Sequence, residues 1–224
     1  MSQNFFTSSI GKKILMAVTG IALFAFVVGH LMGNLQMFGE PYLINSYAHF
    51  LQGLGPILWA IRGGLLAVVL VHLVVAILLT KENMAARPDK YVCRKSVKSG
   101  FADNYMGVLG SLLAIYLVFH VLHFTIRILI YPEYSALVTP EGYRDVYSMV
   151  LYSFQVPWVS AFYIFMMVVL GFHLWHGIPS FFQTLGIRHK YLTPVSNYGG
   201  KLLSVVIALG YMSIPVAVLL GLIE

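Results

Sequence analysis

Six histidines lie inside long apolar stretches of the 224-residue chain, where an ionisable side chain is energetically expensive. They fall in four stretches and are His30, His72, the neighbours His120 and His123, and the neighbours His173 and His176. Histidines in such positions usually face the interior of a helix bundle and carry a function. Neutral imidazole is a common ligand of metal ions and of haem iron. We therefore expect the fold to bring these histidines together in pairs.

The composition indicates a membrane protein. Hydrophobic residues make up 59% of the chain and charged residues only 10%, and the mean hydropathy is +0.82. A soluble domain carries about 25% charged residues. The net charge of +6 does not indicate nucleic-acid binding, because the basic residues cluster between apolar spans. The single cysteine, Cys93, excludes a disulfide framework, an iron–sulfur cluster held by this chain alone, and covalent haem attachment through C-x-x-C-H.

Five apolar spans, each near or above the length needed to cross a bilayer, account for the chain as one integral membrane domain over residues 1–224. Their expected bounds are about 12–38, 57–80, 104–131, 157–184 and 199–222. The first span is too long for the apolar region of a signal peptide, and no small-residue cleavage site follows it. The expected fold class is an all-α membrane protein, a bundle of five transmembrane helices.

Basic residues accumulate on one side of this bundle. Residues 12–13, 81–103 and 185–201 contain 11 of the 14 lysines and arginines. The positive-inside rule places that side in the cytoplasm, with the N-terminus inside and the C-terminus outside.

Counting from the helix ends puts His30 and His120 at one depth. Each lies 17 residues beyond the cytoplasmic end of its span, which is Lys13 in the first span and Asp103 in the third. Seventeen helical residues rise about 25 Å. Both histidines are therefore expected near the outer face of an apolar core about 30 Å thick.

The same count puts His72 and His173 at the opposite depth. Each lies 16 residues beyond the outer end of its span, at Pro56 and Pro157. That is about 24 Å from the outer face, near the cytoplasmic face. The predicted pairs are His30 with His120 outside and His72 with His173 inside.

Two histidine pairs on facing helices can ligate two haem irons through both axial positions. A haem held this way has no free position for oxygen or substrate, so its remaining role is to pass single electrons. The alternative role of each histidine is a hydrogen bond between helices, but four at matched depths favour ligation. A zinc or copper site would need three or four ligands at one depth.

Spacing leaves several roles open. His123 and His176 each lie three residues from a proposed ligand, and periodicity does not decide which member of each pair binds iron. The spare histidine is expected to contact a haem propionate or a quinone. Arg62 and Arg127 lie near the outer ends of their helices, where propionates of an outer haem would point, and snorkelling to lipid headgroups is their alternative role.

Several short motifs resemble the dihaem cytochrome b subunit, of the b558 type, that anchors bacterial succinate:quinone oxidoreductase and quinol:fumarate reductase in the membrane. The resemblance covers essentially the whole chain. The matching stretches are 12–20 (KKILMAVTG), 29–36 (GHLMGNLQ), 48–50 (AHF), 119–121 (FHV) and 172–173 (FH).

The resemblance implies a quinone-reacting electron-transfer subunit with two haem b groups. It selects His120 over His123 and His173 over His176 as ligands, and supports the pairing of His30 with His120 and of His72 with His173. Further implications are a flavoprotein and an iron–sulfur subunit bound on the cytoplasmic side, a membrane quinone of the menaquinone type as substrate, and the bacterial inner membrane as location. A higher oligomer of the complex is compatible with this family.

Some relatives carry a carboxylate two residues before the fourth-span ligand, implicated in proton movement, and this chain has Gly171 there. Polar groups that a quinone could use at the outer level are Asn34, Gln36, Asn45, His49 and His123. Two other functions are consistent with the histidine pattern: a dihaem anchor of a hydrogenase or formate dehydrogenase, and a histidine-lined transporter. The b558-type motifs argue against the first, and the lack of an inverted-repeat pattern argues against the second.

Overall fold

The computed structural model of the chain describes residues 8–86, 101–129, 134, 136–187 and 189–223. It is 85% helical, and its described part has no strand beyond one isolated bridge between Val138 and Arg144. The α-helices are α1 (Ser9–Asn34), α2 (Pro41–Gly53), α3 (Pro56–Ala85), α4 (Phe101–His120), α6 (Val146–Gln155), α7 (Pro157–Thr184) and α8 (Leu192–Leu219). A 3-10 turn, η2 (Leu35–Phe38), extends α1, and a π-helical segment, η3 (Val121–Ile126), extends α4.

Five of these helices are long and apolar enough to cross a membrane: Ser9–Phe38, Pro56–Ala85, Phe101–Ile126, Pro157–Thr184 and Thr193–Leu219. The spans expose many large apolar side chains, such as Leu66 on α3 and Ile115 on α4. Such surfaces are costly in water and normal against lipid. The predicted all-α fold, with five helices long and apolar enough to cross a membrane, is confirmed.

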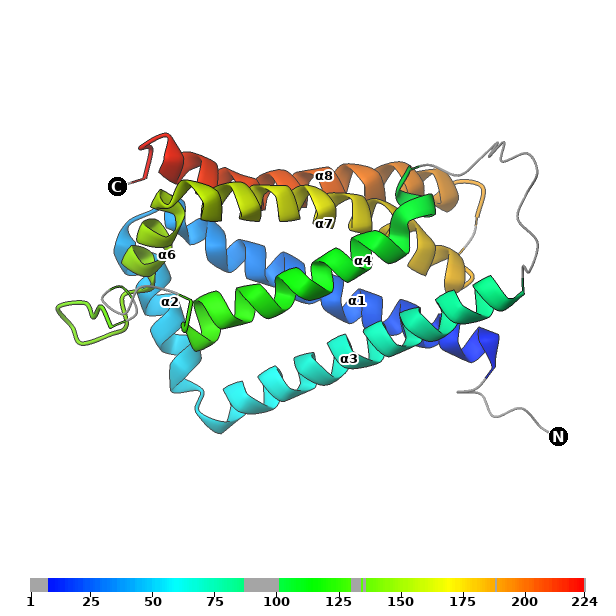
Figure 1. Ribbon diagram of the computed structural model, residues 1–224, viewed down its shortest axis with the longest axis horizontal. Helices are drawn as coiled ribbons and strands as arrows, with labels where there is room; N and C mark the ends of the chain where they lie inside the picture. Colours follow the sequence, from blue (N-terminus) through cyan, green and yellow to red (C-terminus); the bar gives the residue numbers. More distant parts are fainter. Residues whose placement is uncertain (1–7, 87–100, 130–133, 135, 188, 224) are drawn as a thin grey trace.

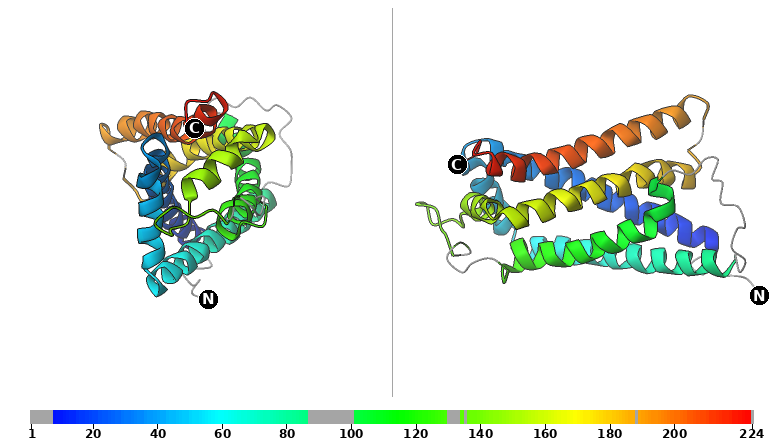
Figure 2. Two further views of the ribbon diagram at one scale, coloured as in Figure 1. Left: turned by 90° about the vertical axis from the view of Figure 1, so that its left-hand side faces the viewer. Right: turned by 45° about the horizontal axis from the view of Figure 1, so that its top comes forward.

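The helices run along the long axis of the bundle, and the short helices α2 and α6 lie together at one end (Figure 1). Viewed from that end, the spans stand around a common axis (Figure 2). The start of α1 and the end of α8 lie at opposite ends of the bundle. In the proposed orientation, the end that carries α2 and α6 is the outer end.

Helix starts follow local sequence signals. The Ser8 hydroxyl accepts a hydrogen bond from the Gly11 amide at 3.0 Å and caps α1. Proline stands in the first turn of α2, α3 and α7, where its missing N–H costs nothing. Gly55, with φ of +52°, permits the sharp turn from α2 into α3.

The second, third and fifth spans differ most from their expected bounds. The third span was expected to run as one helix to residue 131, but it changes to π-helix after His120 and ends at Arg127, whose φ is +65°. The fifth helix begins at Leu192 rather than at residue 199, because its polar first turns continue the helix beyond the apolar part. The expected connection 81–103 is shorter in the structure, since α3 continues to Ala85, and most of it lies outside the described residues.

A buried polar contact joins the two short outer helices. The Asn45 side chain on α2 accepts hydrogen bonds from the amides of Val146 and Tyr147 at 2.8 and 3.0 Å, and it donates to Asp145 at 3.1 Å. Asp145 also caps α6 by accepting from the amide and hydroxyl of Ser148. Asn45, one of the polar groups predicted at the outer level, therefore has a structural role between α2 and α6.

Candidate functional site

The transmembrane helices of the bundle form two halves, α1 with α3 and α4 with α7 and α8. Helix α1 packs against α3, α4 packs against α7, and α7 packs against α8. Contacts of α1 with α7 and with α8 join the two halves. Neither α1 and α4 nor α3 and α7 pack closely in the described part of the chain. Each predicted histidine pair spans one of these unpacked helix pairs.

The structure brings His30 and His120 together at the outer level. Their ring centroids lie 5.9 Å apart, and the ring planes are nearly perpendicular, at 84°. Phe26, one turn before His30, stacks on its ring at 5.4 Å, and Tyr211 of α8 lies 6.2 Å away. The Tyr211 hydroxyl donates to the Val27 carbonyl at 2.7 Å, which ties α8 to the helix that carries His30.

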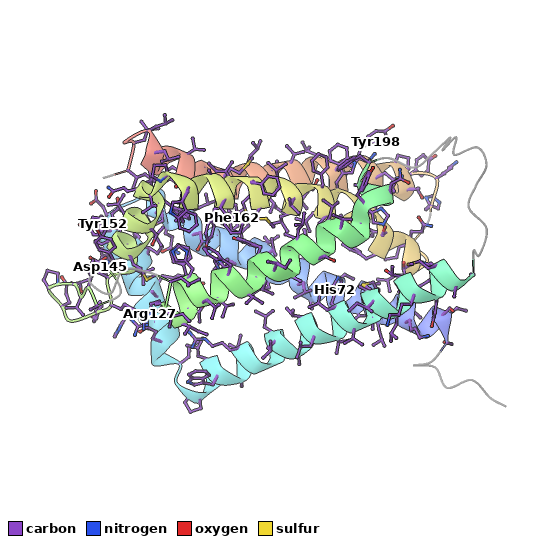
Figure 3. All side chains as sticks on the ribbon, viewed as in Figure 1. His72, Arg127, Asp145, Tyr152, Phe162 and Tyr198 are labelled. Atoms are coloured by element: carbon purple, nitrogen blue, oxygen red, sulfur yellow. The ribbon has the colours of Figure 1, made fainter. Side chains whose placement is uncertain are left out.

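Figure 3 shows His72 on α3 away from the end that carries Arg127 and Asp145, and His173 of α7 lies close enough to His72 to interact with it electrostatically. The ring of His72 has a defined partner. The Thr19 hydroxyl on α1 lies 3.0 Å from His72 Nδ1 and 2.7 Å from the Leu15 carbonyl oxygen. The hydroxyl has one proton, which it donates to Leu15, so it accepts from His72 Nδ1–H. This arrangement leaves His72 Nε2 with a free lone pair, the form in which imidazole binds a metal.

His173 differs, because its Nδ1 atom is buried and has no hydrogen-bond partner among the described residues. A buried polar atom without a hydrogen-bond partner destabilises a fold unless a ligand or a water molecule bonds to it. Glycine faces each inner imidazole: a Cβ atom on Gly110 would lie 3.6 Å from His173 Cε1, and one on Gly20 would lie 3.6 Å from His72 Cε1. A glycine thus lies beside each inner ring, and small residues in membrane helices allow close approach.

His176 has both ring nitrogens engaged. Its Nδ1 lies 2.5 Å from the Asp103 carboxylate, and its Nε2 lies 3.0 Å from the Ser180 hydroxyl. His176 could bind a metal only by breaking one of these contacts, whereas His173 could do so without loss. The choice between these two histidines, which spacing left open, therefore favours His173 on geometric grounds.

His123 is buried, at 3% exposure, and its Nδ1 lies 2.9 Å from the Tyr163 hydroxyl of α7. The same hydroxyl lies 3.4 Å from His120 Nδ1. Tyr163 therefore sits between the two histidines and can donate to one and accept from the other. The π-helical segment begins at the residue after His120. Segments of this kind occur frequently at functional sites.

Two arginines predicted near the outer haem lie at the outer end of the bundle. The Arg62 guanidinium stacks 5.1 Å from the Trp59 ring centroid on α3. Arg127 lines a cavity that it shares with Arg144. Of the other outer polar groups, His49 stacks on Tyr143 at 3.9 Å, while Asn34 and Gln36 lie where α1 passes into η2.

Gly171 lies where α7 approaches α8 closely. A Cβ atom there would lie 3.1 Å from Ala208 Cβ and 4.0 Å from the Ser204 carbonyl oxygen. The carboxylate that some relatives of the resembling family carry at this position would have no room here.

Sequence reasoning missed Thr19 and Tyr163, although the depth count could have found both. Thr19 lies 6 residues beyond Lys13, and Tyr163 lies 6 residues beyond Pro157. Six helical residues rise about 9 Å. Measured from the cytoplasmic end, this puts Thr19 near the depth of the inner histidine pair, and measured from the outer end, it puts Tyr163 near the depth of the outer pair. The same count applied to hydroxyl side chains as well as to histidines would have singled them out.

The chain matches no protein-family model, and neither the curated proteins nor the solved structures contain a significant match to it.

Proposed function

We propose that this chain is the cytochrome b membrane-anchor subunit of a succinate:quinone oxidoreductase or quinol:fumarate reductase, with two haem b groups held by paired histidines. The observation that carries the proposal is the placement of the four histidines. In the described part of the chain each pair spans helices that do not pack closely on each other, and the His30 and His120 rings lie 5.9 Å apart within a bundle of five candidate membrane spans.

His30 and His120 would hold the outer haem, and His72 and His173 the inner one. Imidazole nitrogens bind first-row metals at about 2.0–2.1 Å, so two nitrogens on opposite sides of one ion lie about 4 Å apart. The 5.9 Å between the centroids of His30 and His120 is compatible with that spacing. A haem with two axial histidines supplies one-electron transfer, at a potential set by its ligands and surroundings.

The chain's own residues fix how these imidazoles are presented. Thr19 holds the His72 ring with Nε2 unprotonated, and Tyr163 contacts Nδ1 of His120. Such hydrogen bonds to the far nitrogen orient a ligand and raise its basicity. The apolar spans keep bulk water away from both pairs. His123, His176, Arg62 and Arg127 remain candidates for contacts to propionates or quinone.

The proposal includes partners and location. The basic residues of 12–13, 81–103 and 185–201 would face the cytoplasm of a bacterium, where an iron–sulfur subunit and a flavoprotein would dock. Electrons would pass between those subunits and a membrane quinone, of the menaquinone type, by way of the two haem sites. The dicarboxylate chemistry would belong to the flavoprotein.

The test is the dithionite-reduced minus air-oxidised visible spectrum of the purified protein, with haem quantified per chain. Two low-spin b-type haems per chain are expected. A folded preparation that binds no haem would contradict the proposal and favour a histidine-lined transporter. Copurification of a flavoprotein and an iron–sulfur protein from native membranes would separate this function from that of a hydrogenase or formate dehydrogenase anchor.

A further inference from the structure

Three basic residues lie apart from the other lysines and arginines of the chain. Eleven of the 14 fall in the stretches 12–13, 81–103 and 185–201. The other three are Arg62, Arg127 and Arg144, which come from α3, from the end of η3 and from the segment before α6. Although they are far apart in sequence, all three lie at the outer end of the bundle, close enough for the charges of Arg62 and Arg127 to act on Arg144.

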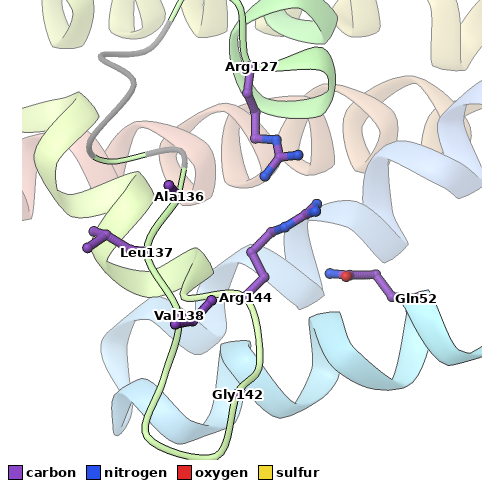
Figure 4. A pocket seen from close by; sticks show the side chains of 7 residues that line it. All are labelled: Gln52, Arg127, Ala136, Leu137, Val138, Gly142 and Arg144. Carbon is purple, nitrogen blue, oxygen red and sulfur yellow. The ribbon is translucent and has the colours of Figure 1, made fainter.

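Two of these arginines line one cavity of about 370 Å³. The guanidinium groups of Arg127 and Arg144 point toward each other across it, and the Gln52 side chain reaches in from α2 (Figure 4). The remaining lining residues are Ala136, Leu137, Val138 and Gly142. None of the lining residues in the described part of the chain is acidic.

The arrangement brings like charges together. Partial burial lowers the pKa of the Arg144 guanidinium, and the positive charges of Arg127 and Arg62 lower it further. The neighbouring carboxylate, Asp145, is engaged by Asn45 and by Ser148 on α6. Converging cations of this kind are stabilised by an anion that bridges them, and guanidinium binds the two oxygens of a phosphate in a planar, bidentate geometry.

The backbone conformation of Arg127 also indicates a ligand site. Arg127 is the only residue other than glycine with a positive φ in the described part of the chain, at +65°. Left-handed backbone is unfavourable for a side chain with a Cβ, and such strain is concentrated at ligand sites and functional turns. Here the left-handed residue ends the π-helical segment and points its guanidinium into the cavity.

The surroundings indicate the source of the anion. Trp59, which stacks with Arg62 near the outer end of α3, is 70% exposed. Tryptophan in this position is typical of the level of lipid headgroups. Helix α3 is also largely unburied within the chain, so acyl chains can lie along it.

We propose that the cavity between Arg127 and Arg144 binds the phosphate of an anionic phospholipid of the outer leaflet. The guanidinium groups of Arg127 and Arg144 hold the phosphate oxygens from two sides. Gln52 donates from α2, and Arg62 adds positive potential at the headgroup level. The site ties the end of the third span to α2 and to the segment before α6. It does not depend on haem binding.

The test measures binding of dihexanoyl phosphatidylglycerol to the full-length protein in detergent, by titration calorimetry, with inorganic phosphate as a second probe. The variants are Arg127→Gln and Arg144→Gln, which remove a charge and keep a polar side chain. Arg144→Lys is the conservative variant. The matched control is Lys190→Gln, because Lys190 lies at the opposite end and its ammonium group stacks on Tyr191 at 4.7 Å.

We expect each glutamine variant to weaken phosphatidylglycerol binding at least tenfold, Lys190→Gln to change it less than twofold, and Arg144→Lys to restore part of the loss. Equal binding by wild type and the Arg144→Gln variant would overturn the proposal. Equally tight binding of inorganic phosphate would assign the site to a free anion instead. The last measurement is the reduction potential of the outer haem in the Arg127→Gln variant. A shifted potential together with unchanged lipid binding would assign the arginines to haem propionates and would overturn the lipid site.

Discussion

The Thr19 hydroxyl lies 3.0 Å from Nδ1 of His72 and donates its own proton to the Leu15 carbonyl at 2.7 Å. A residue of the first span therefore sets which nitrogen of a histidine on the second span carries the proton. The consequence is an Nε2 lone pair at the inner level, where the proposed function requires a ligand.

This contact predicts a difference between two conservative variants. Thr19→Val keeps the side-chain shape and removes the acceptor, while Thr19→Ser keeps the hydroxyl. Losing a hydrogen bond to a ligating histidine costs about 10- to 100-fold in metal affinity. We expect Thr19→Val to lower inner-haem occupancy and potential, and Thr19→Ser to resemble wild type. Potentiometric titration of the two haems measures both, and equal potentials in the two variants would show that the hydroxyl does not act on His72.

The ligand assignment predicts the pattern of loss in alanine variants. His30→Ala and His120→Ala should lose the outer haem, and His72→Ala and His173→Ala the inner one. His176→Ala should keep both, because His176 Nδ1 and Nε2 are engaged by Asp103 and Ser180. Haem per chain and the reduced spectrum measure the outcome. Two haems in His173→Ala together with loss in His176→Ala would reverse the fourth-span assignment.

Tyr163 is predicted to stabilise the outer level. Its hydroxyl lies 2.9 Å from Nδ1 of His123, which is buried at 3% exposure. Tyr163→Phe would leave that nitrogen without its partner, at a cost of about 1–3 kcal/mol. Thermal unfolding in detergent measures the loss. Tyr198→Phe is the control, since Tyr198 is 76% exposed, and equal effects of the two substitutions would show that the Tyr163 hydroxyl contributes nothing specific.

The close contact at Gly171 predicts intolerance of the carboxylate found in some relatives of the resembling family. Gly171→Glu would force α7 away from α8, because its Cβ would already lie 3.1 Å from Ala208 Cβ. It would also bury a polar group in an apolar contact. Burying a polar group without a hydrogen-bond partner destabilises a fold by about 1–3 kcal/mol. Gly177→Glu on the same helix is the control, since a Cβ there meets nothing within 4 Å. Unfolding temperatures in detergent should fall for Gly171→Glu well below those of the control.

The contact between α2 and α6 predicts a dependence of stability on pH. Burial raises the pKa of Asp145, but hydrogen bonds from Ser148 and Asn45 outweigh it and hold the pKa below its ordinary value of 3.8. The stabilisation is therefore fully present above pH 3.8 and is lost as the pH falls through the lower pKa of the folded state.

The measurement is the difference in unfolding temperature between wild type and Asp145→Asn at pH 7, 5 and 3. The difference should be constant between pH 7 and 5 and should shrink at pH 3, because the wild-type carboxyl then begins to protonate. The other carboxylates contribute equally to both proteins and cancel. A difference that does not change with pH would show that the charge of Asp145 does not stabilise the fold.

The sequence by itself determined the five spans, because the length and hydropathy of a membrane helix are local properties. It also determined the relative depths of the histidines, because helical rise converts a residue count into a distance. His30 and His120 are found 5.9 Å apart, as a common depth on facing helices would place them.

Tertiary structure decided what a residue count cannot show, namely which atoms of different helices meet. The proton position on His72 depends on Thr19, and the engagement of His176 depends on Asp103 at the start of another helix. The π-helical turn after His120 and the left-handed Arg127 end the third span early. Arg127 and Arg144 share a cavity only because α2, η3 and the segment before α6 converge. These features arise from side-chain packing between segments distant in sequence, which hydropathy and periodicity do not encode.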